Sequence, residues 1–248
     1  MNDEVKAPSA SLPAGLSVVV PCYNAGARLR PVIETLVRLV DTVIVVDDGS
    51  TDGAIRDLAG LPAETIVLSP NQGKGAAMMA GFRAALAKAG VECVAIVDAD
   101  GQHDPAELPA LYEVFTREQA DLVIGSRAFD LAHVPWRSRV GNKLTITLTA
   151  ALLGKRVPDT QSGYRLHSRR LVEDILANVP AGRYETEMAI LVKAVKSGYK
   201  VTPAPIATIY ETGNPSSHFN KLGDSFRIYR MLFHASRKYG KQTLEKMD

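Results

Sequence analysis

Residues 94–104 read Val-Ala-Ile-Val-Asp-Ala-Asp-Gly-Gln-His-Asp, an apolar run that stops at two acids, Asp98 and Asp100. A continuous run of β-branched and small apolar residues is typical of a buried strand in a parallel sheet, and ligands gather at the carboxyl ends of such strands. Acids at positions i and i+2 can point to the same side, and Gly101 lets the chain turn after them. The segment therefore predicts a ligand site at the end of a central strand.

The spacing of these acids suits a hard divalent cation. Mg²⁺ or Mn²⁺ takes one or two protein carboxylates and completes its octahedral shell with water and phosphate oxygens. We predict that Asp98 and Asp100 are metal ligands, with Gln102 or His103 near enough to assist. The alternative is a loop whose acids cap the next helix. Asp104, which is followed by proline, fits that capping role better.

Length and composition describe an ordinary globular chain. Its 248 residues are 46% apolar, with a formal net charge of +2 and two cysteines. Such a chain can bury a sizeable core as one large domain. Cys22 and Cys93 fall at the ends of predicted strands, which indicates buried thiols and a reducing cytoplasm. The longest apolar run, Leu144 to Leu153, is shorter than the roughly 20 residues of a spanning helix, and the near balance of charge argues against nucleic-acid binding.

Strand and helix patterns alternate along the first half of the chain, after a flexible tail at residues 1–15. We expect strands at residues 17–20, 42–46, 65–68, 93–97 and 122–125, and helices at residues 27–39, 52–58, 75–89 and 105–116. Later elements are helices at residues 142–153, 185–197 and 221–240 and a short strand near residues 206–210. Repeated β-α units predict a single α/β domain with a Rossmann-like, doubly wound, mostly parallel sheet, helices on both faces and an irregular C-terminal part.

Polar segments also follow the first two predicted strands, at residues 20–24 (Val-Pro-Cys-Tyr-Asn) and 46–52 (Val-Asp-Asp-Gly-Ser-Thr-Asp). Neighbouring strand ends form a crevice in which a nucleotide can lie, and an acid there can accept hydrogen bonds from the base or ribose. We choose Asp48 for that role. The alternative is a tight turn in which Ser50 or Thr51 caps the next helix, which explains the hydroxyls but not two adjacent acids.

Two basic residues lie where they could meet phosphate. Lys74 stands in Asn-Gln-Gly-Lys-Gly (residues 71–75) at a predicted helix start, although the spacing is not that of a Walker motif. A solvated lysine at a helix start is an equal alternative. Arg127 follows the fifth predicted strand beside Asp98, where a guanidinium suits phosphate, and an ion pair with one of the nearby acids is the alternative.

Five motifs, in order, resemble the family 2 glycosyltransferases with the GT-A fold, nearest to the polyprenyl-phosphate (dolichol-phosphate-mannose-synthase-like) branch. They are VVPCYN (19–24), VDDGSTD (46–52), NQGKG (71–75), VDADGQH (97–103) and IGSR (124–127). The resemblance extends over residues 16–237 and is more specific for fold and reaction class than for the sugar. It implies a nucleotide-sugar-binding half at residues 16–127 and an acceptor-side half at residues 128–220.

The resemblance also implies roles for individual residues of the donor half. Asp98, Asp100 and Gln102 match the metal and diphosphate site, and Asp48 matches the acid that binds the base. The donor-binding residues that it implies are Pro21, Tyr23, Asn24, Asp48, Lys74, Asp98 and Arg127, with Asp100 and Arg127 also catalytic. Many relatives have Glu where Ala25 stands here, so any nucleotide contact of that acid must come from elsewhere.

In the second half, Asp-Thr-Gln-Ser-Gly-Tyr-Arg (159–165) resembles the acceptor-side loop of the family, which assigns Ser162, Gly163 and Arg165, together with Glu185, to the acceptor side. Glu187 is the nearest match to the base that relatives use on hydroxyl acceptors. A helix-start acid favoured by the dipole is the alternative. His218 resembles a histidine that approaches the metal or the donor diphosphate in GT-A domains, and a structural histidine is the alternative.

The implied reaction is inverting transfer of a sugar from a GDP- or UDP-linked donor to a polyprenyl phosphate or related lipid, with Mg²⁺ or Mn²⁺. An anionic phosphate acceptor needs no base, whereas a glycan or other hydroxyl acceptor needs Glu187. A non-catalytic sugar-nucleotide-binding protein is a second alternative. A nucleotidylyltransferase would carry a glycine-rich basic signature at the first strand end, which Pro-Cys-Tyr-Asn lacks.

Two basic segments predict contact with an anionic membrane surface. Residues 221–241 place aromatic and leucine side chains at helical spacing among arginines and lysines, and Trp136 precedes Arg137, Arg139 and Lys143. The alternative for each segment is an apolar face packed on the domain. We therefore expect a cytoplasmic protein bound peripherally to the inner face of the membrane, and a membrane protein of the same pathway is a candidate partner.

Overall fold

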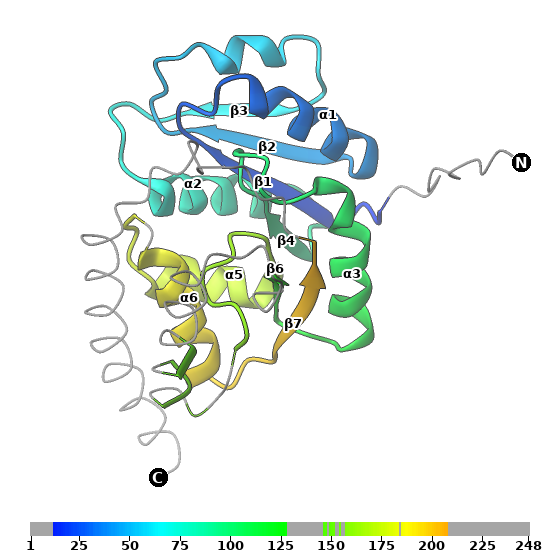
Figure 1. Ribbon diagram of the computed structural model, residues 1–248, viewed down its shortest axis with the longest axis vertical. Coiled ribbons are helices and arrows are strands. Elements are labelled where there is room, and N and C mark those ends of the chain that lie inside the picture. The colour runs from blue at the N-terminus through cyan, green and yellow to red at the C-terminus, as the bar shows by residue number, and fades with distance from the viewer. Residues whose placement is uncertain are drawn as a thin grey trace, which may run out of the picture.

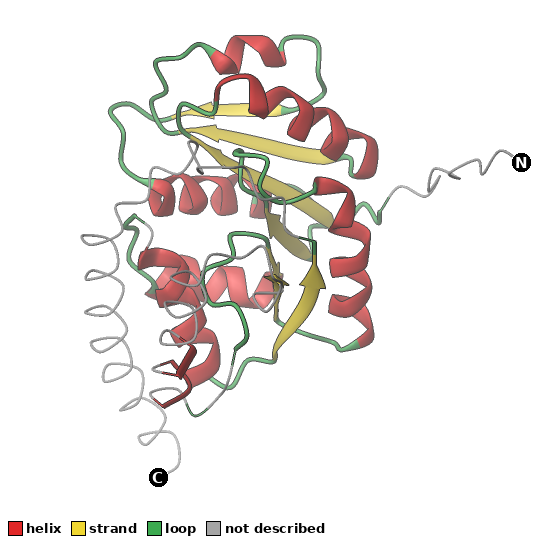
Figure 2. Ribbon diagram, in the orientation of Figure 1, coloured by secondary structure: helices red, strands yellow, loops and turns green. Residues whose placement is uncertain are grey.

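The computed structural model describes residues 12–127, 146–147, 149–151, 154, 157–183 and 185–207. In these residues, seven strands form one sheet in the order β3-β2-β1-β4-β6-β5-β7 (Figures 1 and 2). The strands are β1 Leu16–Cys22, β2 Thr42–Asp47, β3 Glu64–Val67, β4 Cys93–Ile96, β5 Leu122–Arg127, β6 Arg165–Ser168 and β7 Val201–Ile206. Neighbours pair in parallel except where β6 pairs with β4 and β5. The predicted mostly parallel α/β sheet is confirmed.

Helices cover both faces of this sheet, as predicted (Figure 1). They are α1 Leu29–Leu39, α2 Lys74–Leu86, α3 Leu108–Arg117, α5 Arg169–Asn178 and α6 Glu185–Lys196. Successive side chains of β1 point to opposite faces of the sheet. Val19 belongs to the core cluster with α2, α5 and α6, whereas Val18 and Val20 belong to the cluster with α1 and α3. In α1 the buried residues Leu29, Val32, Ile33 and Leu36 recur at helical spacing, which fixes the face that it turns to the sheet.

Several predicted elements need correction. The strand expected near residues 206–210 is β7, Val201–Ile206, and its Pro203 and Pro205 are tolerated because β7 is an edge strand. Neither β6 nor α5 was expected. The helix expected at residues 52–58 is a 3₁₀ helix at Ala54–Leu58, and α2 ends at Leu86 rather than at residue 89.

Of the two helix caps that the sequence suggested, one is present and one is not. Asp104 Oδ1 accepts a hydrogen bond from Ala106 N at 2.9 Å, which confirms the predicted cap. Ser50 and Thr51 cap no helix, contrary to expectation, because the 3₁₀ helix follows Gly53 and Asp52 accepts from its first amide.

Other expectations concern the termini, the thiols and the membrane. Leu12 N donates to Leu39 O at 2.8 Å, so hydrogen bonding to the domain begins before Leu16. Cys22 and Cys93 are buried free thiols, as predicted. Within the described ranges, no helix combines the length and apolar character needed to cross a bilayer. The basic helix at residues 221–240, the segment around Trp136 and His218 lie outside the described residues.

Candidate active site

The two acids that follow β4 lie at the carboxyl edge of the sheet, where β1 and β2 also end. Asp98 and Asp100 are both partly exposed, and Asp100 Oδ1 accepts a hydrogen bond from Gln102 N at 3.0 Å. Burial and the neighbouring charge of Asp98 raise the pKa of Asp100 to about 6. The charge of Asp98 thus disfavours the ionised form of Asp100, and a divalent cation beside the two carboxylates would stabilise that form.

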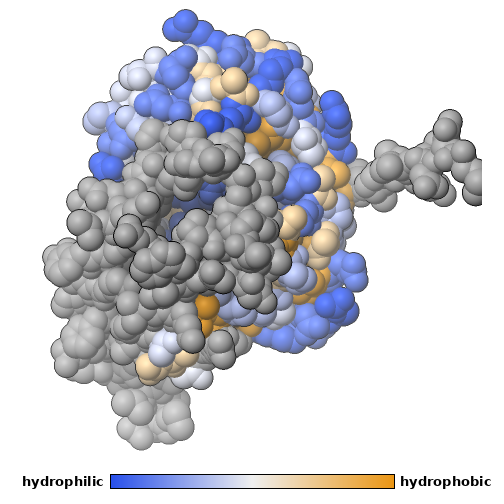
Figure 3. Space-filling model, in the orientation of Figure 1, coloured by the Kyte–Doolittle hydropathy of each residue, from blue (hydrophilic) through white to orange (hydrophobic). Residues whose placement is uncertain are grey.

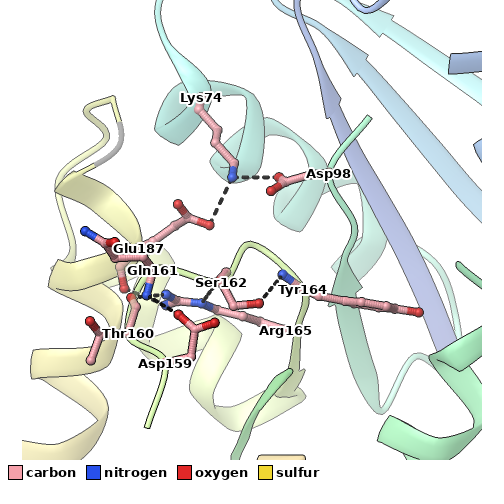
Figure 4. Close-up of polar contacts among 9 residues, drawn as sticks. All are labelled: Lys74, Asp98, Asp159, Thr160, Gln161, Ser162, Tyr164, Arg165 and Glu187. Atoms are coloured by element: carbon pink, nitrogen blue, oxygen red, sulfur yellow. Dashed lines mark hydrogen bonds and ion pairs between the residues drawn. The ribbon is translucent and has the colours of Figure 1, made fainter. Parts of the chain in front are cut away.

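Lys74 lies between Asp98 and an acid from the other half of the chain (Figure 4). Its Nζ is 2.6 Å from Asp98 Oδ1 and 3.1 Å from Glu187 Oε1. Burial alone would raise the pKa of Asp98, but Lys74, with His103 and Arg127, outweighs it and holds that pKa below its ordinary value. Burial likewise disfavours the ammonium, yet Asp98 and Glu187 raise the pKa of Lys74. Lys74 is therefore an ion-paired residue and not the solvated lysine of the alternative interpretation.

Three glycines allow this close assembly. A Cβ atom at position 163 would overlap the carboxylate of Asp98, which means that Gly163 brings the predicted acceptor-side loop directly against this predicted metal ligand. A Cβ at position 75 would overlap Thr186 Oγ1 and lie 2.5 Å from Gly182 O. A Cβ at position 73 would lie 2.7 Å from Arg183 Cγ. The start of α2 therefore packs tightly on the start of α6.

Asp48 holds the loop that leads into α2. Its Oδ1 accepts a hydrogen bond from Gln72 N at 2.8 Å and its Oδ2 accepts one from Gly73 N at 2.7 Å. The residue is 2% exposed. A carboxylate can accept about four hydrogen bonds, and the two backbone amides occupy two of these positions. An N–H or hydroxyl group of a nucleotide could bind only at the remaining positions. Base binding by Asp48 stays a prediction, and its loop-holding role was not foreseen.

The predicted nucleotide-binding residues at the end of β1 connect to the end of β2. Asn24, with φ of 49°, donates its N–H to Ser50 Oγ at 2.9 Å, and its Oδ1 accepts from Thr51 N at 2.8 Å. Pro21 is buried in β1, whereas Tyr23 is 39% exposed. A pocket of about 530 Å³ lies next to this junction; its lining residues are Asp47, Ser50, Thr51, Asp52, Gly53, Ile55 and Arg56.

Arg127 forms an ion pair with Asp159, the first residue of the predicted acceptor-side loop. Its Nε is 2.7 Å and its Nη2 3.2 Å from the two carboxylate oxygens of Asp159, which is fully buried. This two-point contact fixes the plane of the guanidinium. The sequence signal for Asp159 was its place at the head of the acceptor-side loop, yet no role was predicted for it.

The predicted acceptor-side loop, residues 159–165, is held by hydrogen bonds to its own backbone and to the start of α6. Arg165 is fully buried and donates to the carbonyl oxygens of Thr160, Ser162 and Glu187 at 2.7–2.8 Å. Ser162 is also fully buried, and its Oγ accepts from Tyr164 N at 3.3 Å. Both side chains therefore hold the loop in shape, and their assignment to the acceptor side stays a prediction. Glu185 and Glu187 occupy the first turn of α6, where the helix dipole favours acids.

His103 lies beneath the site, 2% exposed, with its ring centroid 5.8 Å from that of Tyr164. Burial lowers its pKa to about 4, so the ring is neutral at pH 7. Its Nδ1 has no hydrogen-bond partner in the described part of the chain.

The acids after β4 also fit the metal that was predicted. Within the described ranges, no group of three or more His, Cys, Asp or Glu side chains could hold a metal ion. Mg²⁺ and Mn²⁺ do not require such a group when substrate phosphate and water complete the shell. Asp98 and Asp100, with Gln102 beside them, supply the oxygen donors that these ions prefer.

The sheet places acids at the carboxyl ends of β2 and β4, beside the end of β1, and this edge is where open α/β sheets bind their ligands. The family model described as Glycosyl transferase family 2 matches residues 17–176, more than half of the chain. The chain therefore belongs to the family 2 glycosyltransferases.

Curated relatives are similar over most of their length. Polyprenol monophosphomannose synthase of Mycolicibacterium smegmatis is 34% identical over 201 residues, which cover 76% of this chain and 75% of the relative. UDP-N-acetylglucosamine–dolichyl-phosphate N-acetylglucosaminyltransferase of Methanococcus voltae is 28% identical over 236 residues, which cover 87% and 94%.

A solved structure supports the fold. Glucosyl-3-phosphoglycerate synthase of Mycobacterium tuberculosis, crystallised with Mn²⁺, UDP and glucosyl-3-phosphoglycerate, superposes with a TM-score of 0.67 at 24% identity. The match covers 89% of this chain and 79% of the synthase. The predicted GT-A fold is thereby confirmed.

Proposed function

We propose that this glycosyltransferase moves a sugar, with inversion, from a nucleoside diphosphosugar to a polyprenyl phosphate. The observation that carries the proposal is the similarity to two relatives whose names specify polyprenol and dolichyl-phosphate acceptors, one of them 34% identical. The donor class is supported by the acids at the carboxyl edge of the sheet. The nucleotide, GDP or UDP, and the sugar are left to experiment.

The described residues suit this reaction. Asp98 and Asp100 would hold Mg²⁺ or Mn²⁺, which when bound stabilises negative charge on the departing nucleoside diphosphate. Arg127, kept in one orientation by Asp159, would contact the same charge. Asp48 fixes the loop at residues 71–73 and leaves acceptor positions for the base. A phosphate acceptor is already anionic, so its oxygen attacks the anomeric carbon without a base.

A hydroxyl acceptor is the second candidate, and one observation favours it. Glu187 is 6% exposed in the first turn of α6, and Lys74 connects its carboxylate to Asp98. A buried acid so close to the donor site could accept a proton from a hydroxyl. With a hydroxyl acceptor, Glu187→Gln should lower transfer about a hundredfold or more at saturating metal, since general bases contribute about 10²–10⁴. With a phosphate acceptor, the same substitution should cost little under that condition.

The test is incubation with radiolabelled GDP- and UDP-sugars, each offered polyprenyl phosphate or free glycans, followed by separation of lipid-linked product. We expect label in the lipid fraction only when divalent metal is present. The matched control is Asp100→Asn, which keeps the side-chain volume but removes the charged ligand. Product that forms only on glycans would favour the hydroxyl alternative, and full turnover in excess chelator would remove the metal from the proposal.

Membrane contact is the last part of the proposal. In the described part of the chain, the exposed large apolar side chains are Tyr23 and Val67, and on the face seen in Figure 3 hydrophilic residues cover much of the upper part, with smaller apolar patches among them. This surface is a poor match for a bilayer. The basic segments at residues 221–241 and 136–143 remain the better candidates for peripheral binding at the inner face of the membrane.

A further inference from the structure

Lys74 supplies a positive charge at a position where the proposed metal would also act. Its ammonium contacts Asp98, a predicted metal ligand, at 2.6 Å, and Glu187 at 3.1 Å (Figure 4). The cation and its two partners come from three different parts of the sheet edge: the start of α2, the end of β4 and the start of α6. We propose that Lys74 is an internal counter-cation that competes with the divalent metal for Asp98, and that Glu187 draws Lys74 away when the metal binds.

The direct contacts of the neighbouring cations support the assignment of Lys74 as the counter-cation of Asp98. Arg127 forms its two-point pair with Asp159, and the guanidinium of Arg165 is directed at three backbone carbonyls. Lys74 is in direct contact with Asp98, and side-chain exposures of 17% for Lys74, 20% for Asp98 and 8% for Glu187 place all three in largely dehydrated surroundings. Charge interactions are stronger there than in water.

The backbone of Lys74 has little freedom to retreat. Gly73 and Gly75, on either side of it, pack so closely against Arg183 and Thr186 that neither position tolerates a Cβ atom without rearrangement. Lys74 therefore stays near the metal position and can change partners mainly by rotating its side chain. Moving toward Glu187 keeps the ammonium paired while it releases Asp98.

Two substitutions should change metal affinity in opposite directions. Lys74→Met removes the competing charge at similar length, so the donor-free protein should bind Mn²⁺ more tightly. Glu187→Gln removes the second partner of Lys74, so the lysine should hold Asp98 more strongly and Mn²⁺ should bind more weakly. A lysine that serves only as packing, or only as a diphosphate contact, predicts neither shift.

On this proposal, the donor would also change how tightly the metal binds. The diphosphate of a nucleotide sugar brings negative charge that both the metal and Lys74 can share. The metal should therefore bind far better with the donor than alone. This inference rests on the proposed metal-dependent function.

The test is titration of the intact, donor-free protein with MnCl₂, with free Mn²⁺ measured by electron paramagnetic resonance. We expect about tenfold tighter binding for Lys74→Met, because unit charges a few ångströms apart in a protein interact by more than that factor, and several-fold weaker binding for Glu187→Gln. The matched control is Lys88→Met, which removes the exposed partner of Glu64 just beyond the other end of α2 and should leave the affinity unchanged. Asp100→Asn should lose the site.

Circular dichroism and urea unfolding establish that each variant is folded. Unchanged or weaker Mn²⁺ binding in folded Lys74→Met overturns the inference, and so does unchanged or tighter binding in Glu187→Gln. If Lys74→Met does not fold, the Glu187→Gln result decides alone. Absence of Mn²⁺ binding in every form would instead refute the proposed metal site, and this inference with it, whereas wild-type binding that neither variant alters refutes the inference alone.

Discussion

Gly163 lies against the carboxylate of Asp98, so closely that a Cβ atom at position 163 would overlap Asp98 Oδ2 and lie 2.5 Å from Asp98 Cγ. The contact joins the predicted acceptor-side loop to the predicted metal ligand. Because the neighbour is a short, ion-paired acid, the strain of an added methyl group would fall on the orientation of that acid.

Gly163→Ala should therefore lower sugar transfer about a hundredfold, since displacement of a reacting group by about 1 Å can cost that much. Activity per folded molecule, measured with saturating acceptor, is the direct readout. The matched control is Gly81→Ala, whose Cβ would overlap Val19 in the core. That variant should lose about 1–3 kcal/mol of stability by overpacking but keep its activity per folded molecule. Equal activity in the two variants would contradict the role of Gly163.

Asp100 should show a conflict between stability and activity. Its pKa of about 6, against an ordinary 3.8, means that its ionised form is disfavoured in the folded protein. This raised pKa favours folding at low pH, and the benefit is lost as pH rises through about 6. In chelator at pH 7.5, Asp100→Asn should therefore raise the free energy of unfolding by about 2–3 kcal/mol, although it abolishes metal-dependent transfer.

Urea unfolding at pH 7.5 and pH 4 checks this prediction. The stabilisation should shrink at pH 4, where wild-type Asp100 is protonated in the folded state. Mn²⁺ should stabilise the wild type more than the variant. A variant less stable than the wild type at pH 7.5 in chelator would show that burial and the charge of Asp98 do not disfavour the ionised form of Asp100.

Asp48→Ala should affect both stability and donor binding. The buried carboxylate accepts from two backbone amides, and loss of such charged hydrogen bonds should cost about 2–4 kcal/mol. We also expect weaker nucleotide binding by calorimetry, because the loop at residues 71–73 loses its support. As a control, Asp52→Ala removes bonds to Gly26 and Ala54 from an exposed side chain and should cost under about 1 kcal/mol. A stable variant with unchanged donor affinity would exclude Asp48 from both roles.

His167 should make the protein sensitive to acid. It is fully buried: its Nδ1 donates to Val94 O at 3.2 Å, and its ring meets the edge of Phe82. Burial, with the nearby Arg165, lowers its pKa to about 3, whereas the unfolded chain keeps the ordinary 6.5. Protons therefore bind the unfolded state first, and stability should fall as pH drops from about 6.5 toward 3, by about 2 kcal/mol at pH 5.

His167→Gln tests that expectation, because glutamine can still donate to Val94 O but does not titrate. The loss of unfolding free energy between pH 7.5 and pH 5, measured in urea, should be smaller in the variant by about 2 kcal/mol. The buried His103 titrates in the same direction and remains in both proteins. Identical losses in both proteins would contradict the prediction.

Binding to anionic vesicles should depend on the basic C-terminal segment. Each basic residue near an anionic bilayer contributes about 1 kcal/mol, and salt screens the attraction. The intact chain should cosediment with anionic vesicles at low ionic strength, less at high ionic strength, and little with neutral vesicles. A chain truncated before Lys221 should remain in the supernatant. Equal recovery in the supernatant for both chains under every condition would remove the peripheral-membrane proposal.

The sequence by itself determined the alternation of strands and helices and the position of the acids. Strand burial and helix amphipathicity depend on local periodicity, so β1, β2, β4, α1 and the place of Asp98 at the edge of the sheet could be predicted. Capping by Asp104 is equally local, since it needs only a side chain and an amide two residues away. The ordered motifs added the family, which their combined spacing specifies.

Only the tertiary structure decided where β6 and β7 lie and which residue each charge meets. The four residues of β6 carry Arg165 and His167, and β7 contains two prolines, so neither has the periodic signal of a strand. The pairs Arg127–Asp159 and Lys74–Glu187 join residues far apart along the chain. No local pattern encodes such partners, because the sheet order and the packing of α2 on α6 bring them together.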